Sequence, residues 1–587
     1  MGGLVSSLIE LKEKQHEPKK FYECVLSLYR QQKIENLDTK DLCQVMVELH
    51  NRKKIDLCEQ AIKAIEQGIN VFQVINLLED VIPHLNHDIE TFLALLETFY
   101  EGSKNDLVAY LRYSSISKLV EYQYEFSRKV LEQLISTDRP FVAEYITEFF
   151  LRFSKGNEKI IHDELVMLKD HPSIYTTQGI IKALSILNYE QEENKKTLLV
   201  ETFKVFNHIE SRKLEGIDNW ITAACGNLLD FDLAVDKLLG LAEQNSPEID
   251  FALSRVLFLN TKKYADKDWF EPLLMTLSRT KHSHISIIEN IDFVLAALVR
   301  EKNNWALAER FFISWITQSD YRKVQDLERL DKLFDSTFHA LTTDRNNLQK
   351  LVTRFFNHDS SKVHSAVGEI ISYCNLHRIP ALKFDKDELS KLGYQDVLFV
   401  GRKVLGYLID CKTICSLTFS LLDCSTKNKR IQSLVYAIFN EHISHNYPGS
   451  TIEFLTEEVA STKSKIKKNL ASEVIKNTEA YLKARDALPR IREIVPPSQQ
   501  SRLVMREQYK VMNHSIEQAR KGSITQLFTT IHLKHGSGSF SFANNDYRSP
   551  SKLSSYSSVM ELPVSERNSP VSAFIETAGF RMVKRGD

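Results

Sequence analysis

Apolar residues recur at spacings of three and four along most of this chain. In residues 59–82 they are Ile62, Ile65, Val74, Leu77, Leu78 and Val81. This spacing places the apolar side chains on one face of an α-helix, whose period is about 3.6 residues. Residues 90–100, 127–151, 248–259, 287–299 and 306–316 repeat the pattern. The pattern therefore predicts a long succession of amphipathic helices.

Short polar clusters separate these predicted helices. Ser246-Pro247-Glu248 is one of them, and it combines an N-cap residue with proline in the first turn. Short loops make consecutive helices antiparallel. The apolar stripe of Phe251–Leu259 is broad, which indicates a helix that touches neighbours on more than one side. Glycine is scarce, with 19 in 587 residues, which favours helices over tightly turning strands.

Residues 1–448 are therefore predicted to form an irregular α-solenoid-like array of antiparallel helical hairpins, similar in pattern to HEAT or tetratricopeptide arrays. The whole chain is predicted to be all-α. Residues Trp305–Phe311 have the pattern of a tetratricopeptide helix, but no fixed repeat period runs through the sequence. A large helical bundle without repeats is the alternative.

Residues 449–489 are predicted to form one long charged helix. Ser450 and Glu453 have the spacing of a capping box, and Lys465, Lys467 and Lys468 follow later. Acidic residues before basic ones suit the helix dipole. The helix is expected to run to about Leu488, because Pro489 disfavours helical angles in the residue before it.

Residues 490–535 are predicted to be a basic helical segment whose first helix begins after Ser498 and ends near Lys521. Met505, Tyr509 and Met512 lie on its apolar side. The candidate binding residues are Arg502, Arg506, Lys510, His514, Arg520 and Lys521. A basic row opposite an apolar one can contact phosphates, an acidic partner or the acidic body of the same chain. The structural alternative is a solvated face of a packed helix.

Residues 523–535 permit two interpretations. Ile524, Leu527, Phe528 and Ile531 form a complete helical stripe that ends before Gly536, which favours a helix. The alternative is a β-hairpin with its turn at Gly536-Ser537-Gly538 and residues 540–542 in the second strand.

Residues 536–587 have the composition of a linker, with eleven serines between Gly536 and Pro570. Phe540, Tyr547 and Tyr556 are spread along the segment. Purely disordered spacers contain fewer aromatic residues. We expect an extended, partly ordered arm that lies on the helical body or on a partner, and a free tail is the alternative.

Charge and cysteine content narrow the function classes only slightly. The net charge is −1, but residues 490–587 carry 14 Lys and Arg against 8 Asp and Glu. Eight scattered cysteines without a recognisable secretory leader indicate a reducing, cytoplasmic compartment. No stretch approaches the 18 apolar residues of a membrane-spanning helix.

Candidate chemistry is sparse. Cys411 and Cys415 share a helical face near Cys424, but their apolar surroundings favour core packing over metal binding. Four close histidine pairs lack a zinc-protease motif: His84 and His87, His282 and His284, His442 and His445, and His532 and His535. No phosphate-binding loop, nucleotide fingerprint or hydrolase elbow is present, so no cofactor is expected.

The sequence therefore predicts a cytoplasmic scaffold or adaptor that binds a protein partner. The first alternative is a nucleic-acid-binding protein that uses residues 490–535. The second is an enzyme or effector whose site is assembled from distant residues. The sequence sets no oligomeric state.

Overall fold

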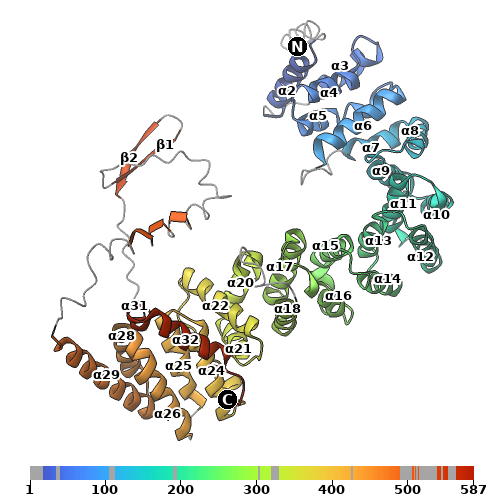
Figure 1. Ribbon diagram of the computed structural model, residues 1–587. Coiled ribbons are helices and arrows are strands. Elements are labelled where there is room, and N and C mark those ends of the chain that lie inside the picture. The colour runs from blue at the N-terminus through green and yellow to red at the C-terminus, as the bar shows by residue number, and fades with distance from the viewer. Residues whose placement is uncertain are drawn as a thin grey trace. The chain divides into compact units, whose positions relative to one another are not determined.

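The chain folds into two compact units, Met1–Asp344 and Arg345–Asp587, as the computed structural model shows. The boundary between them lies inside the predicted body of residues 1–448. The structure describes residues 17–34, 40–104, 113–189, 195–301, 304–318, 329–424, 428–489, 505–507, 509–510, 513–514, 538–543, 546–552 and 563–586. Helices dominate both units, which confirms the prediction of a solenoid-like helical array (Figure 1).

Unit 1, Met1–Asp344, begins with helices that pack in overlapping pairs. Helix α2 contacts α4 and α5, and both of these contact α6. The elements are α2 (Pro18–Ile34), α3 (Lys40–Asn51), α4 (Leu57–Glu66), α5 (Val71–Leu78), the 3₁₀ turn η1 (Ile82–His84) and α6 (Ile89–Ser103).

One predicted helix in this region is two helices. Residues 59–82 read as a single amphipathic pattern, but α4 ends at Glu66 and α5 begins at Val71. Gly68 between them has a φ of +93°, which residues with a side chain rarely adopt. The N–H groups of Gly68 and Ile69 return to carbonyl groups of α4, which ends that helix.

From α7 onward the helices of unit 1 form two layers. Alternate helices of the first layer contact one another, as do those of the second layer from α10 onward, so each hairpin contributes one helix to each layer. The first layer consists of α7 (Ser114–Tyr122), α9 (Val142–Phe153), α11 (Ile174–Ile186), α13 (Ile217–Gly226), α15 (Pro247–Tyr264), α17 (Ile285–Arg300) and α20 (Asp335–Thr343). The second layer consists of α8 (Tyr124–Ser136), α10 (Glu158–Met167), α12 (Lys195–Ser211), α14 (Asp232–Ala242), α16 (Phe270–Thr276) and α18 (Trp305–Gln318).

Three further short elements lie in the described part of unit 1. They are η3 (Leu168–Asp170), η5 (Leu277–Arg279) and α19 (Leu330–Leu333).

Aromatic side chains fill the space between the two layers. Phe149 and Phe206 are fully buried, as are Phe270, Phe311 and Trp315. Burial of a large aromatic side chain stabilises the fold by about 2 to 3 kcal/mol, so this core holds successive hairpins together. Within the first layer the helices approach closely at glycine. A Cβ atom on Gly179 of α11 would lie 2.9 Å from the Ala143 carbonyl oxygen of α9.

Unit 2, Arg345–Asp587, continues with helical hairpins and ends with a separate C-terminal segment. Its elements are α21 (Arg345–Phe356), α22 (Ser361–Leu376), α23 (Lys386–Ser390), α24 (Tyr394–Tyr407), α25 (Cys411–Ser420), η6 (Leu421–Cys424), α26 (Lys429–Ala437), the π-helix η7 (Ile438–Ile443), α27 (Ser444–Asn446), α28 (Pro448–Ser461), α29 (Lys465–Asp486), β1 (Gly538–Ala543), β2 (Asp546–Lys552), α31 (Val564–Asn568) and α32 (Pro570–Met582).

The predicted long charged helix at residues 449–489 is a hairpin of two helices. Helix α28 ends at Ser461, α29 begins at Lys465, and the two pack against each other. The Ser464 hydroxyl accepts a hydrogen bond from the Lys467 N–H at 3.4 Å, which caps α29. A serine that caps a new helix competes with continuation of the old one.

The C-terminal arm contains regular structure. Strands β1 and β2 pair antiparallel, with Gly538 opposite Lys552 and Ala543 opposite Asp546. Gly538 therefore lies inside a strand and not in the turn of the predicted alternative hairpin. Residues 523–535, for which a helix was favoured, lie outside the described part of the chain. Helices α31 and α32 pack against each other and against α27 and α24.

Candidate functional site

The basic residues predicted as a binding site are only partly described. Arg506, Lys510 and His514 lie in helical turns and are exposed, while Arg502, Arg520 and Lys521 lie outside the described residues. Lys510 forms an exposed ion pair with Glu507 at 2.7 Å, which offsets its charge. Exposed pairs of this kind contribute less than about 1 kcal/mol.

The apolar side predicted for this helix is also exposed where it is described. Met505 is 60 % and Tyr509 is 61 % exposed. These side chains are therefore not buried in the helical body.

A more developed surface lies on the first layer of unit 1, where a groove of about 380 Å³ runs over helices α9, α11, α13 and α15. We call it the first-layer groove. Trp220, Phe251 and Leu259 supply its apolar contacts, and Phe251 and Leu259 are 41 % and 67 % exposed. Its other lining side chains include Glu144, Lys182, Ser185, Asn219, Asn227, Arg255 and Asn260.

At one end of the groove, charge is neutralised by the protein itself. The Lys182 ammonium lies 2.6 Å from a Glu144 carboxylate oxygen, and the Tyr113 hydroxyl donates to the same oxygen at 2.7 Å. These bonds link α11 to α9. The Lys182 charge is therefore already balanced, and this end of the groove is a neutral polar wall.

The other end of the groove carries an exposed arginine and three asparagine side chains. Arg255 is exposed, and the described residues place no hydrogen-bond or ion-pair partner on its guanidinium. The Asn219 Oδ1 atom is buried and accepts no hydrogen bond from the described part of the protein. Asn227 donates to the Ser185 hydroxyl at 2.9 Å, and Asn260 donates to the Val256 carbonyl at 2.9 Å. These bonds orient the two amides and leave their carbonyl oxygens as acceptors.

Sequence reasoning did not find this groove. The broad apolar stripe of Phe251–Leu259 was interpreted as contact with several neighbours, and α15 does contact α13, α14, α16 and α17. Nevertheless Phe251, Phe258 and Leu259 of that stripe are exposed on the molecular surface. The available signal was that this segment has more apolar residues than one helical face can hold. An apolar stripe that is wider than the buried face of its helix must leave some of its residues exposed.

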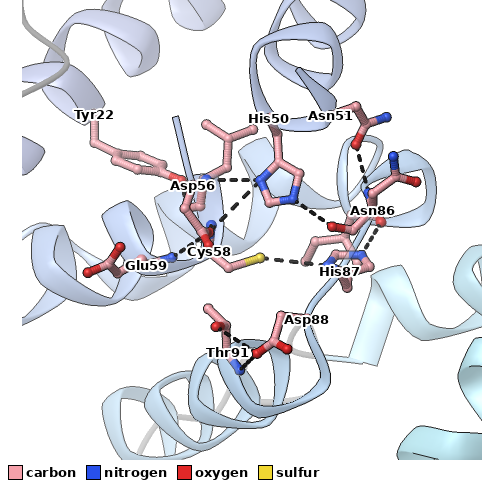
Figure 2. Close-up of polar contacts among 12 residues, drawn as sticks. Tyr22, His50, Asn51, Asp56, Cys58, Glu59, Asn86, His87, Asp88 and Thr91 are labelled. Atoms are coloured by element: carbon pink, nitrogen blue, oxygen red, sulfur yellow. Dashed lines mark hydrogen bonds and ion pairs between the residues drawn. The ribbon is translucent and has the colours of Figure 1, made fainter. Parts of the chain in front are cut away.

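A second cluster of polar residues joins α3, α4 and the start of α6, and it brings Cys58 next to His87 (Figure 2). The Leu57 N–H donates to His50 Nδ1 at 3.1 Å, so the His50 proton is on Nε2, which contacts the Asn86 carbonyl at 3.1 Å. His87 Nε2 donates to the Ile82 carbonyl at 2.7 Å. His87 Nδ1 is then an acceptor, and it lies 3.7 Å from Cys58 Sγ.

The electrostatics of this cluster oppose nucleophilic catalysis. Burial raises the pKa of the Cys58 thiol far above its usual range and lowers the pKa of His87 to about 4. A nucleophilic cysteine needs the opposite shifts, which favour a thiolate beside an imidazolium. Cys58 is also only 2 % exposed. The cluster therefore holds the loops between these helices in place, and the first histidine pair of the sequence contributes to packing.

The remaining sequence candidates lie in structural environments. Cys411 and Cys415 are buried free thiols whose sulfur atoms are 3.7 Å apart, as their apolar surroundings indicated. His442 pairs with Glu576 at 3.0 Å, and the His445 ring packs against Tyr481.

Among the described residues, His162, Asp163 and Glu201 offer possible ligand atoms for a metal within 4.8 Å of one another. The fully buried His162 already contacts the Thr202 hydroxyl through Nε2 at 3.1 Å. Nothing else in the described residues marks these three as a metal site. In the described part of the chain no helix has both the length and the apolar character needed to cross a membrane.

Comparison with known proteins identifies no family. No protein-family model and no curated protein matches the chain. A solved engineered protein aligns with 72 % of this chain and 98 % of its own at 11 % identity and a TM-score of 0.18. The crystal structure of SYS-1 aligns with 81 % of this chain and 85 % of its own at 12 % identity and a TM-score of 0.22. TM-scores this low do not establish a shared fold, so the architecture rests on the helical layers themselves.

Proposed function

We propose that this protein is an interaction scaffold that binds an extended segment of a protein partner in the first-layer groove. The observation that carries the proposal is the row of oriented amides beside an exposed arginine and three apolar side chains. Asparagine side chains offer both a donor and an acceptor, which is what the backbone of an extended peptide requires. Successive helices of the first layer present these groups in one continuous groove.

The chemistry of the groove defines the preferred segment. An aliphatic or aromatic side chain would pack against Trp220 and Phe251, and a carboxylate would pair with Arg255. The Glu144 end is neutral and offers no further charge. We therefore expect a short segment with one acidic and one large apolar residue. Aromatic and arginine residues carry a large share of binding energy in protein interfaces.

The experiment is a selection of displayed random peptides against the full-length protein, followed by affinity measurement with the enriched peptides. Trp220→Ala and Arg255→Glu should each raise the Kd at least tenfold, which corresponds to about 1.4 kcal/mol. Met167→Ala and Lys204→Glu are matched controls on the second layer, since both side chains are exposed there. Enriched peptides whose affinity is unchanged by the groove variants would contradict the proposal.

The location and the C-terminal region complete the proposal. We propose a cytoplasmic location, which is supported by the scattered cysteines of the sequence. Residues 490–535 and 536–587 are proposed as adaptor elements outside the groove.

Nucleic-acid binding through the exposed Arg506 and Lys510 is the second candidate. It predicts that affinity for a nucleic acid falls steeply with salt and is reduced by Arg506→Glu with Lys510→Glu. Peptide binding that is unaffected by these two substitutions and by nuclease would separate the groove from this second activity.

A further inference from the structure

The C-terminal helices α31 and α32 lie across other helices of unit 2, although residues 487–563 separate them from α29 in the sequence (Figure 1). Helix α32 packs mainly on α24, and α31 packs on α27. We call Val564–Met582 with the following residues Val583–Gly586 the tail.

A buried lysine donates hydrogen bonds to the C-terminal end of α32. Lys403 of α24 is 3 % exposed, and its ammonium lies 2.6 Å from the Arg581 carbonyl, 2.7 Å from the Val583 carbonyl and 3.5 Å from the Phe580 carbonyl. The last carbonyls of a helix lack partners within the helix, and the helix dipole is negative there. A buried ammonium is costly unless it is hydrogen-bonded. Lys403 therefore donates hydrogen bonds to carbonyl groups at the end of α32, and these bonds offset the cost of burying its ammonium.

Two arginines of the tail make further polar contacts near its C-terminal end. Arg581 Nε donates to the Gly406 carbonyl at 2.5 Å. Arg585 binds Asp359 at 3.1 Å, and it also contacts Asp396 and Asn357. Bonds between ionised groups are roughly twice as strong as neutral ones. The C-terminal end of the tail is thus recognised by charge and by its carbonyl groups.

The apolar stripe of α32 faces solvent. Val571, Phe574, Ile575 and Met582 are 70 %, 71 %, 65 % and 73 % exposed, while Ala573 is buried. An amphipathic helix that belongs to a core normally buries its apolar stripe. A cavity of about 90 Å³ also lies between the tail and the helices below it, lined by Ala573, Glu576 and Thr577 on the tail side. The exposed apolar stripe and the cavity leave polar contacts as a large part of what holds the tail, although α32 also lies close to Gly406 of α24 and Glu576 pairs with His442.

We propose that unit 2 carries a binding site for the basic C-terminal end of an α-helix, and that the chain's own tail is its exchangeable ligand. The site consists of Lys403, the Gly406 carbonyl, Asn357, Asp359 and Asp396. The tail of the same chain fills it. The long connection to α29 lets the tail leave without unfolding the helices of unit 2. The tail site shares no residue with the first-layer groove of unit 1.

The first test uses the full-length protein with a protease recognition sequence inserted between Ser554 and Ser558. After cleavage, the tail fragment should co-elute with the body at low salt. Excess peptide 563–587 should replace it, and 1 M salt should weaken its retention because salt screens charged contacts. A fragment lost at low salt from a folded body would overturn the proposal. So would a fragment that neither competitor nor salt removes, since that is the behaviour of permanent packing.

The second test asks which residues the site uses. Binding of labelled peptide 563–587 to the cleaved protein after the fragment is exchanged should weaken at least tenfold with Lys403→Met. Lys412→Met is the control, because Lys412 is exposed on α25 and lies only at the limit of an ion pair, 4.0 Å from Glu453. Circular dichroism verifies that both variants remain folded. Equal binding by both variants would overturn the assignment of the site to Lys403.

Substituted peptides test the orientation of the helix in the site. Arg581→Ala with Arg585→Ala should abolish binding, whereas Phe574→Ala should leave it within about twofold, because Phe574 faces solvent and alanine preserves helix propensity. The opposite result, with loss at Phe574 and tolerance at the arginines, would show that the apolar stripe makes the contact and would refute the proposal.

Discussion

Asp292 on α17 anchors Thr337 at the start of α20, the next helix of the first layer. Asp292 Oδ1 accepts the Thr337 N–H at 2.8 Å and lies 2.6 Å from the Thr337 hydroxyl, and Oδ2 accepts the Ser336 N–H at 2.9 Å. The first N–H groups of a helix have no partner within the helix. The cap of α20 is therefore supplied by a residue 45 positions earlier in the sequence.

Substitution of Asp292 should loosen the junction between α17 and α20. Asp292→Ala leaves two amides without a partner, so we expect a loss of about 2 to 4 kcal/mol. Asp292→Asn keeps one acceptor oxygen and should cost about half as much. Hydrogen exchange of the α20 amides measures the effect, and unchanged exchange in Asp292→Ala would contradict the structural role.

Two glycines in unit 1 should respond in opposite ways to alanine. Gly179→Ala brings a Cβ within 2.9 Å of the Ala143 carbonyl, so α9 and α11 must separate and the free energy of unfolding should fall by about 1 to 3 kcal/mol. A Cβ atom on Gly240 of α14 would instead point into open space, with no neighbouring atom within 4 Å. Gly240→Ala should therefore stabilise the protein by up to about 1 kcal/mol through helix propensity.

Urea unfolding of the two glycine variants side by side measures this difference. Equal effects of the two substitutions would show that helix propensity, and not the close approach of α9 and α11, decides the outcome.

Unit 2 should lose stability in mild acid because of His364. Burial lowers the pKa of His364 from 6.5 to about 4, and the nearby charges of Lys403 and His358 act in the same direction. The unfolded chain therefore binds a proton below about pH 6.5 that the folded chain does not accept until about pH 4. Stability is complete above pH 6.5 and falls by up to about 3 kcal/mol between these two values.

The variant His364→Phe tests the source of this pH dependence. It keeps an aromatic ring among Phe356, Phe399 and Tyr407 but cannot be protonated. Thermal unfolding between pH 7 and 4.5 should show a weaker dependence on pH in the variant. An identical dependence in both proteins would assign the effect to other groups.

Cys58 should resist alkylation in the folded protein despite its histidine neighbour. Its thiol is buried, and its raised pKa leaves almost no thiolate at neutral pH. Labelling with iodoacetamide followed by peptide mass mapping should show Cys58 reacting only after denaturation. Rapid labelling of Cys58 in the folded protein would contradict this prediction and would favour the alternative of an enzyme, with Cys58 as its nucleophile.

The sequence by itself determined the helical class and predicted an array of helical hairpins, with a large bundle as the alternative. Spacings of three and four specify which face of each helix is apolar, and those faces can be buried only against other helices. The same local information misjudged two helix boundaries. Gly68 and Ser464 end or begin helices through backbone angles and capping bonds, and these compete with an apolar pattern that continues past them.

Only the tertiary structure decided which distant residues meet in the first-layer groove and at the tail. Trp220 lies on α13 and Arg255 lies on α15, and the packing of α13 on α15 brings them into one groove. Lys403 and Arg581 are 178 positions apart, and no local pattern relates a buried lysine to the carbonyl groups of a distant helix end. Periodicity indicates which side of a helix is buried. Contacts between distant segments depend instead on how all the helices of the unit pack together.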